Sequence, residues 1–366
     1  MPRAPLEDVG QDPLASWAPG LPPIAVLPPT VSSIGRIPED LNNLGYFQGA
    51  LLAVVVQHLA SLEFVGTAVM IAPGLALTAT HILTDALDAL YDGRSDDVAV
   101  VCAGIRDGSI DKWRVVSSAV DTFGNLPAEM RPRGVPLGEP AGPDLAFLSL
   151  QLLSAAGHDW SFTQFPLTTR ASKPGEEDVT IIGLRFPDVV HEAGEDGAGD
   201  LAMNGSLYAA TGRVMSVCPW RRDDSRMPWP TIEIDCGSLG GMSGGAVLDQ
   251  SGHVLGVISS GYGDVVTYAT WLIGSLGVSV DVPWPSGLYP QPVRLVDIPD
   301  HVMRIEGREA IRVISPQRMV YQPWCKPPPA RLDDRSSTVT PFTGPAVFDG
   351  NVVAPLNEPA EPATLD

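Results

Sequence analysis

Short apolar runs separated by turn residues fill the chain between about residues 47 and 280. Runs this short and this rich in β-branched residues are typical of strands, and regular strands with turn signals between them indicate a barrel or a sandwich. The runs fall into two groups of about six, which meet near residue 155, and this predicts an all-β fold of two packed antiparallel six-stranded β-barrels. The first group is ALLAVVVQHL, EFVGTAVMIA, LALTAT, DVAVVCAGI, KWRVVSSAV and DLAFLSLQL. The second is DVTIIGLRF, LYAATGRVMSV, TIEIDC, GGAVLD, HVLGVISS and VVTYAT.

The same pattern divides the chain into four parts. Residues 1–43 are rich in proline and acid, and PGLPPIAVLPPT reads as an extended linker or strap. The first barrel is expected over residues 44–155. The second is expected over 156–283, with a short helix at YATWLIGSLG after its strands. Residues 284–366 form a C-terminal extension in which VMRIEGREAIRV could be a hairpin, and the part after residue 322 is expected to be largely irregular.

Composition and charge narrow the functions open to this chain. A net charge of −20 disfavours nucleic-acid binding, because neutralising phosphates needs clustered Lys and Arg. The N-terminus lacks the apolar run of a signal peptide, and no stretch reaches the ~18 apolar residues of a membrane span. The 4 cysteines show no close pairs; Cys218 and Cys236 flank adjacent predicted strands and could pair, but buried free thiols are favoured. We expect a cytoplasmic protein with no membrane or nucleic-acid partner.

The stretch GGMSGGAVLDQSGHVLGVISSG, which contains Ser243, poses the main chemical question. A serine flanked by glycines is the nucleophile of α/β-hydrolases when a helix and then a histidine follow it. Here a hairpin pattern follows Ser243, with no helical period, which argues against that fold. The other precedent is the serine protease built on paired β-barrels, in which the histidine and the aspartate come earlier in the chain.

Both partners are present upstream, in that order. GTAVMIAPGLALTATHIL supplies His81, and GPDLAFLSLQL supplies Asp144 where an apolar strand opens. These three segments resemble the trypsin-like (chymotrypsin-fold) serine peptidases, particularly bacterial members without zymogen activation. His58 and Asp121 are weaker rivals, because His58 lacks the Ala-Thr lead-in and Asp121 does not open an apolar strand. The intervals between the motifs imply loop insertions, most obviously the acidic TDALDALYDGRSDD after His81.

The resemblance implies a role for each of these residues. His81 would accept the proton of Ser243, Asp144 would hold the imidazole, and the N–H groups of Gly241 and Ser243 would form the oxyanion hole. No metal or organic cofactor is expected. Met242 departs from the secreted relatives, where an Asp at that place pairs with the N-terminus freed by zymogen cleavage. That activation switch is therefore absent.

The same resemblance locates the substrate-binding segments. The primary pocket would be lined by Gly237 and Ser238 before the nucleophile and by Ser259, Ser260 and Gly261 after it. Because Gly237 places no charge there, the pocket is expected to take an uncharged residue of a protein or peptide substrate. The backbone of residues 259–261 would pair with that substrate as an added β-strand.

Two alternatives to a freely active protease stay open. One is a catalytically silent module that keeps the barrels and binds a partner protein. The other is a latent protease whose cleft is blocked by its N- or C-terminal extension until a regulatory protein releases it. The remaining histidines are expected at surface or loop positions, namely His158, His191, His253 and His301. The acidic run HEAGEDGAGD is expected to be a solvated loop, with weak calcium binding as the alternative.

Overall fold

The computed structural model describes most of the barrels and parts of both extensions. The residues described are 24–26, 35–41, 47–57, 62–91, 99–106, 109–120, 142–154, 162–170, 172–185, 190–192, 202–204, 206–218, 222–223, 226–290, 292–315, 318–321, 346–349 and 353–355. Several positions discussed above lie outside them: His58, Asp121, His158, Cys325, the side chain of His191, most of the acidic run at 191–200, and most of residues 1–43 and 322–366.

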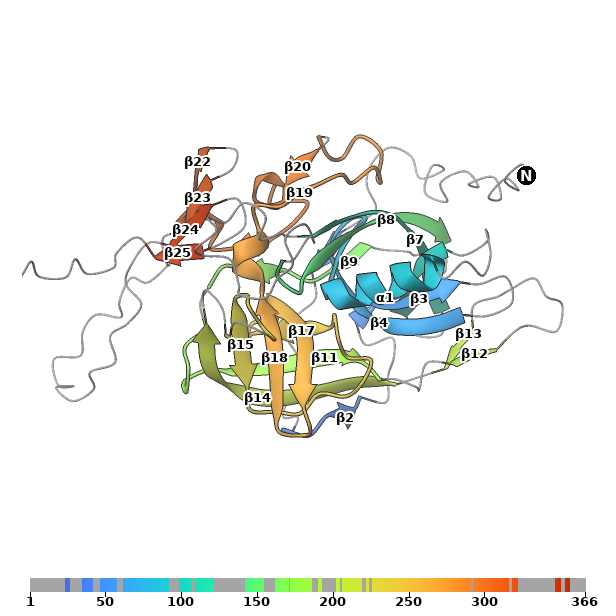
Figure 1. The fold of residues 1–366 in the computed structure, drawn as a ribbon. Coiled ribbons are helices and arrows are strands. Elements are labelled where there is room, and N and C mark those ends of the chain that lie inside the picture. Colours follow the sequence, from blue (N-terminus) through green and yellow to red (C-terminus); the bar gives the residue numbers. More distant parts are fainter. Residues whose placement is uncertain are drawn as a thin grey trace, which may run out of the picture.

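The first six predicted strands close into one antiparallel barrel, in the order β3-β4-β5-β8-β7-β6 (Figure 1). The strand bounds are β3 Leu51–Gln57, β4 Leu62–Ala72, β5 Leu75–Thr78, β6 Ala99–Arg106, β7 Ser109–Val120 and β8 Ala146–Ser154. Strand β3 is buried along nearly its whole length, which explains its unbroken apolar sequence. In the centre of this barrel wall, Leu52 lies opposite Ala68 on one side and Gly104 on the other.

The second six strands form another ring, drawn from green to orange in Figure 1. Their bounds are β11 Asp178–Leu184, β14 Leu207–Cys218, β15 Thr231–Ile234, β16 Ala246–Leu248, β17 Val254–Tyr262 and β18 Val266–Trp271. They pair in the order β16-β11-β14-β15-β18-β17, and pairing of β17 with β16 closes the ring. The predicted fold of two antiparallel six-stranded barrels is thereby confirmed.

A helix that the sequence analysis treated as an inserted loop follows directly after β5. Helix α1 spans Thr80–Tyr91, so His81 lies in its first turn. Ile82, Leu83 and Ala86 are buried, which gives the helix an apolar face at helical spacing. A Cβ at Gly66 in β4 would overlap the Ile82 side chain, so α1 packs closely against the barrel wall. The many acidic residues in this segment hid the apolar face.

The predicted helix at YATWLIGSLG is much shorter than expected. Strand β18 continues to Trp271, and only a 3₁₀ turn, η4 Leu272–Ser275, follows it. Tyr268 to Thr270 pair with β15, and this pairing keeps the start of the segment extended. Among the helices that the structure describes, none has the length and apolar character needed to span a membrane.

The N-terminal extension contributes two short strands, of which one pairs with a strand of the second barrel. Strand β1, Ile24–Val26, runs parallel to β9, Phe162–Gln164. Strand β2, Glu39–Asp40, pairs with β14 of the second barrel. The part of this extension that the structure describes is therefore attached along the barrels, as the expected strap would be.

The C-terminal extension also returns to the barrels. Strand β21, Ile305–Glu306, pairs with β10, Leu167–Thr168, which in turn pairs with β17. The predicted hairpin at VMRIEGREAIRV does not form, because β21 and the next strand have different partners.

The remaining elements are β12 Val190–Glu192, β13 Ala202–Asn204, β19 Ser279–Val280, β20 Val293–Arg294, η5 Leu295–Asp297, η6 Arg308–Ala310, and the four-stranded sheet β22 Ile311–Ser315, β23 Arg318–Tyr321, β24 Ala346–Asp349 and β25 Val353–Pro355.

Aromatic packing joins this extension to the first barrel. Trp284 packs edge-on against Trp113 of β7 with ring centroids 5.2 Å apart, and it stacks on Phe162 at 6.1 Å. All three rings are buried. Large aromatic side chains contribute strongly to packing energy, so residues after the second barrel are part of the core rather than an appended tail.

Candidate active site

His81 and Asp144 face each other in the first barrel, as the sequence analysis expected. The Nδ1 atom of His81 lies 2.8 Å from Oδ2 and 3.1 Å from Oδ1 of Asp144. The backbone N–H of His81 also donates to Asp144 Oδ1, at 3.0 Å. The carboxylate therefore contacts both the main chain and the ring of the same residue. This fixes the position of the imidazole and places the proton of a neutral ring on Nδ1, leaving Nε2 as an acceptor.

Burial and charge have opposite effects on the pKa values of His81 and Asp144. Burial lowers the pKa of His81, but the hydrogen bond and the negative charge of Asp144, with a contribution from Asp85, outweigh it and raise that pKa above its ordinary value. Burial raises the pKa of Asp144, but His81 and further donors outweigh it and hold the pKa below its ordinary value. Asp144 thus stays ionised beside a histidine that can accept a proton.

Ser259, one of the predicted substrate-binding residues, also contacts the first barrel. Its hydroxyl is buried and donates to Asp144 Oδ2. A β-bulge in β17 leaves Ser259 without a cross-strand partner between Ile258 and Ser260. The bulge lets a residue of the second barrel reach the carboxylate of the first.

The loop carrying Ser243 is bound to the first barrel through Thr67 of β4. The Thr67 hydroxyl donates to the carbonyl of Gly241 at 2.8 Å, and the Thr67 N–H donates to the carbonyl of Ser243 at 2.9 Å. Thr67 is fully buried, and its hydroxyl also accepts the Leu184 N–H. Both residues flanking Met242 are therefore hydrogen-bonded to Thr67.

Close packing at Gly244 brings the Ser243 loop toward the start of α1. A Cβ at Gly244 would overlap the Thr67 carbonyl and the Thr78 hydroxyl, and would lie 3.2 Å from the Ala79 nitrogen. Ala79 precedes His81 by two residues, so Ser243 and His81 lie in adjoining segments. No hydrogen bond joins their side chains among the residues described, whereas His81 and Asp144 are directly bonded.

The predicted oxyanion-hole donors lie in a turn whose other N–H groups donate hydrogen bonds to backbone carbonyls. Met242 N–H donates to Leu239, Gly244 N–H to Ile258 and Gly245 N–H to Met242. Within the described residues, the N–H groups of Gly241 and Ser243 have no such acceptor. Gly241 has φ +94°, a left-handed conformation that favours glycine, so this residue suits the tight turn.

Two of the residues predicted to line the primary pocket, Gly237 and Gly261, pack closely against neighbouring segments. A Cβ at Gly237 would meet the backbone of Asp264, which lies in the β17–β18 turn. A Cβ at Gly261 would overlap the Ser238 hydroxyl. The segments around Gly237 and Gly261, far apart in the sequence, are therefore close neighbours.

Asp235, two positions before Gly237, forms contacts with Arg36 and Arg213. Its carboxylate forms an ion pair with Arg36 at 3.1 Å and accepts the N–H of Arg213. The carbonyl of Arg36 also accepts the Gly237 N–H at 3.0 Å. The N-terminal extension thus contacts the pocket segment directly, a contact that the sequence analysis did not foresee.

One edge of β17 is available beside Ser260 and Gly261. On one side these residues pair with Tyr268 and Thr267 of β18. On the other side, pairing with β16 ends at Val257. Within the described residues, this leaves the edge of β17 beside Ser260 and Gly261 without a neighbouring strand, and an extended peptide could add a strand at such an edge.

The described cysteines are all free thiols: Cys102, Cys218 and Cys236. The preference for free thiols at Cys218 and Cys236 over a disulfide is thereby confirmed. Burial raises the pKa of both Cys102 and Cys236 to about 12, so these thiols stay protonated and unreactive. Met242 is fully buried and its sulfur accepts the Leu239 N–H, a packing role in place of an activation switch.

Comparison with known proteins completes this description. Residues 66–257, more than half of the chain, match the family model of the trypsin-like peptidase domain. The chain is also similar to solved structures at low sequence identity. The active form of the Rv3671c protease from M. tuberculosis has 15% identity and a TM-score of 0.37, with 69% of this chain and 86% of that chain covered. The serine endoprotease from Yersinia pestis has 17% identity and a TM-score of 0.35, with 61% and 58% covered. None of the curated proteins matches the chain.

Proposed function

The chain belongs to the trypsin-like peptidase domain family and is by that membership a serine endopeptidase, and we propose that His81, Asp144 and Ser243 carry out its reaction. The family match confirms the resemblance expected from the three motifs. Proteins or peptides are accordingly the substrates.

The proposed reaction begins with proton transfer from Ser243 to Nε2 of His81 as the hydroxyl oxygen attacks the scissile carbonyl. Asp144 holds the ring by Nδ1 and stabilises the imidazolium that forms. The N–H groups of Gly241 and Ser243 donate to the developing oxyanion, for which loss of one donor typically costs about 10²–10³ in kcat. His81 then protonates the leaving amine, and water hydrolyses the acyl-enzyme by the same steps.

One observation carries this assignment more than any other. The buried carboxylate of Asp144 binds the ring and the backbone of His81, while Gly244 of the nucleophile loop lies against Ala79, close to His81 in sequence. The order His, Asp and Ser spans 162 positions, from His81 to Ser243. A buried carboxylate such as Asp144 costs free energy unless it is hydrogen-bonded, so packing alone does not explain why these polar groups converge. A shared chemical role accounts for it.

For the substrate we propose an extended peptide paired with the β17 edge at Ser260 and Gly261, and an uncharged side chain in the primary pocket. The ion pair between Asp235 and Arg36 supports this, because it engages the carboxylate two positions before Gly237, which could otherwise attract a basic side chain. Ser238 and Gly261 would form one wall of the pocket, and Gly237 with the Asp264 backbone another.

We further propose a cytoplasmic location and control by a partner protein acting through the extensions. Free buried thiols at Cys102 and Cys236 fit a reducing compartment. The contact of Arg36 with Asp235 and Gly237 supports a link between the N-terminal extension and the pocket. The absence of an activation aspartate, with Met242 in its place, supports control by other means than zymogen cleavage.

Labelling by a fluorophosphonate probe tests the proposed nucleophile. The purified full chain should react at Ser243, and Ser243→Ala should abolish both labelling and peptide hydrolysis. The matched control is Ser279→Ala, which changes an exposed serine of β19 and should leave labelling intact. A folded native chain that is not labelled would favour the silent binding module, and labelling that survives in Ser243→Ala would assign the reaction to another residue.

A further inference from the structure

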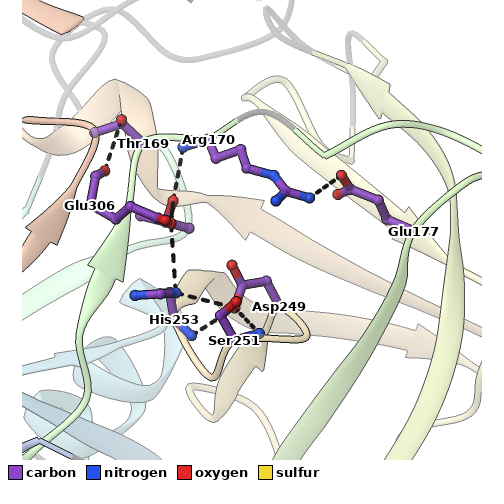
Figure 2. A network of polar contacts seen from close by, with 8 residues as sticks. Thr169, Arg170, Glu177, Asp249, Ser251, His253 and Glu306 are labelled. Carbon is purple, nitrogen blue, oxygen red and sulfur yellow. Dashed lines mark hydrogen bonds and ion pairs between the residues drawn. The ribbon is translucent and has the colours of Figure 1, made fainter. Parts of the chain in front are cut away.

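A second histidine-centred cluster lies at the opposite end of β16 from the nucleophile loop (Figure 2). Asp249 follows β16, His253 precedes β17, and Glu306 ends β21 of the C-terminal extension. The three side chains converge, each offering one ligand atom, with these atoms all within 4.8 Å of one another. His253 was expected at a surface or loop position; it lies in a loop, but it is only 8% exposed.

The Nδ1 atom of His253 is buried and has no hydrogen-bond partner among the described residues. It faces two carboxylate oxygens, Asp249 Oδ1 at 3.4 Å and Glu306 Oε2 at 3.6 Å. Both distances exceed the 2.7–3.2 Å typical of a hydrogen bond from nitrogen to oxygen. A buried nitrogen without a hydrogen bond is destabilising, and a cation bound between this nitrogen and the two carboxylates would satisfy it.

These separations match the edges of a tetrahedral metal site. Zinc binds histidine nitrogen at about 2.0–2.1 Å and carboxylate oxygen at about 2.0–2.2 Å. Two ligands of a tetrahedron with such bonds lie ~3.4 Å apart, which follows from the tetrahedral angle and those bond lengths. The observed 3.4 and 3.6 Å agree with that spacing, and both also lie within ion-pair range.

Other groups already orient both carboxylates. Asp249 Oδ1 accepts the N–H groups of Ser251 and His253, each at 2.8 Å. Glu306 Oε2 accepts the Thr168 hydroxyl at 3.0 Å. Outer contacts of this kind fix the ligands of metal sites before the metal binds.

The local charge suits a divalent cation. Asp249 and Glu306 together carry two negative charges when ionised, and a neutral His253 adds none. The nearest cations are Arg170 and Arg304, and the Arg170 guanidinium forms its own ion pair with Glu177, as Figure 2 shows. The Glu306 side chain is 38% exposed, so water can reach the cluster and supply a fourth ligand.

We propose that Asp249, His253 and Glu306 bind one divalent transition-metal ion, for which Zn²⁺ is the best match. The donor set of one imidazole and two carboxylates with a water completes the four-coordinate geometry that zinc prefers. The ion would join β21 to the turn between β16 and β17, the hairpin that follows the nucleophile loop. Its role is structural, because the triad chemistry needs no metal.

Zinc titration of the full-length chain, after EDTA treatment and removal of the chelator, tests this site. Calorimetry should give one tight Zn²⁺ per chain, and thermal unfolding should show a higher Tm with Zn²⁺ than without it, because a ligand of the native state stabilises that state. Substituted Co²⁺ should give the intense visible bands of a tetrahedral site. No stoichiometric binding and no change in Tm would overturn the proposal.

Paired variants assign the bound ion to the cluster. Glu306→Gln keeps size and removes a charge, and it should weaken Zn²⁺ binding by more than the roughly 10–100-fold typical of losing an outer contact. Glu309→Gln, three residues further along and exposed, is the matched control and should bind like the native chain. His253→Gln should abolish the Co²⁺ bands, while His301→Gln, at an exposed histidine, should keep them.

The outcome that contradicts the assignment is specific. If Glu306→Gln and Glu309→Gln bind Zn²⁺ equally well, the ion lies elsewhere, for example at His81 and Asp144. The titrations are made on chains whose native near-ultraviolet circular dichroism is verified, and Glu306→Gln should pass that check because Glu306 is partly exposed. Neither readout uses peptidase activity, so the result is independent of the proposed reaction.

Discussion

At the scale of single residues, the site depends on the hydrogen bonds that the buried Asp144 carboxylate accepts. This carboxylate is only 7% exposed, and it accepts hydrogen bonds from the ring and backbone of His81 and from Ser259. Charge-assisted hydrogen bonds are about twice as strong as neutral ones, which is how an ionised carboxylate can stay buried. The motif predicted Asp144 and His81, but Ser259 is one of several serines near the glycine turn, and only the bulge in β17 identifies it.

The raised pKa of His81 predicts an acid limit to activity. His81 must be neutral to accept the Ser243 proton, so kcat/KM should fall as the pH drops through its pKa, with a midpoint above the ordinary value of about 6.5. Asp144→Asn should lower that midpoint and reduce kcat by about 10⁴. A kcat/KM profile against pH measures both. A native midpoint at or below 6.5, or an unchanged one in Asp144→Asn, would contradict this.

The raised pKa of His81 also makes the free energy of unfolding depend on pH. Because the pKa of His81 is raised in the folded state, its contribution to the free energy of unfolding is fully present below the unfolded pKa of about 6.5 and is lost as pH rises through the folded pKa. Asp144, with a lowered pKa, contributes in the opposite direction: its share is present above the unfolded pKa and is lost as pH falls through the folded one.

Ser259→Ala should slow catalysis without abolishing it. The variant removes a donor to a buried carboxylate, a bond of about 1.5–3 kcal/mol, and its loss should lower kcat/KM by roughly 10-fold to 100-fold. KM should change little if Ser259 acts through Asp144 rather than on the substrate. Steady-state kinetics across pH will separate the two effects. An increase confined to KM would return Ser259 to the substrate-binding residues.

At the scale of elements, Thr67 couples strand β4 to the nucleophile turn. The turn of residues 240–245 was predicted from its glycines, but its anchor lies in another strand, 174 residues from Gly241. Nothing in the motif around Thr67 distinguishes its hydroxyl from that of Thr78, which donates to the Thr67 carbonyl. The importance of Thr67 appears only when the barrels meet.

Thr67→Val tests this anchor with an isosteric change. It leaves the Gly241 carbonyl and the Leu184 N–H without their buried partner, so the free energy of unfolding should fall by about 2–4 kcal/mol. Activity should fall as well, because the turn carrying Ser243 is released. Urea unfolding and kcat/KM are the measurements.

Thr270→Val is the matched control. Thr270 is also fully buried, but its hydroxyl has no partner among the described residues. Removing an unsatisfied hydroxyl should therefore leave stability unchanged or raise it. Equal losses in free energy of unfolding in the two variants would mean that packing, and not the hydrogen bonds of Thr67, explains the effect of replacing a buried threonine.

At the scale of the whole molecule, both extensions are joined to the barrels. Residues 35–41 run along β14 and reach the pocket segment, and Trp284 packs into the first barrel. The division at residues 43, 155 and 283 stays a prediction, and these contacts show that the segments beyond those positions are tied to the barrels. Regulation through the extensions would then act by adjusting the pocket as readily as by covering it.

Deletion of residues 1–41 tests the role of the N-terminal extension. The deletion removes the bond from Gly237 N–H to the Arg36 carbonyl and the pairing of β2 with β14, so KM should rise and kcat/KM should fall several-fold. Arg36→Ala is the control, because it keeps the backbone bond and removes an exposed ion pair worth about 0–1 kcal/mol. A higher kcat/KM after deletion would mean instead that the extension blocks the cleft.

The sequence by itself determined the strand pattern, the two-barrel fold and the order of His81, Asp144 and Ser243. These are properties of local periodicity and of short motifs, which the chain carries wherever it folds. It did not determine α1, because the apolar face formed by Ile82, Leu83 and Ala86 lies in a segment that reads as an acidic loop. Nor could the sequence identify the long-range contacts that Thr67, Ser259 and Arg36 make.

The tertiary structure decided the long-range contacts. Thr67 meets Gly241, Ser259 meets Asp144 and Glu306 meets His253 only because separate strands and turns are brought together by barrel closure and by the return of the extensions. Hydrogen bonds and metal geometry depend on separations of a few ångströms, and a sequence pattern sets no such distance between residues far apart in the chain.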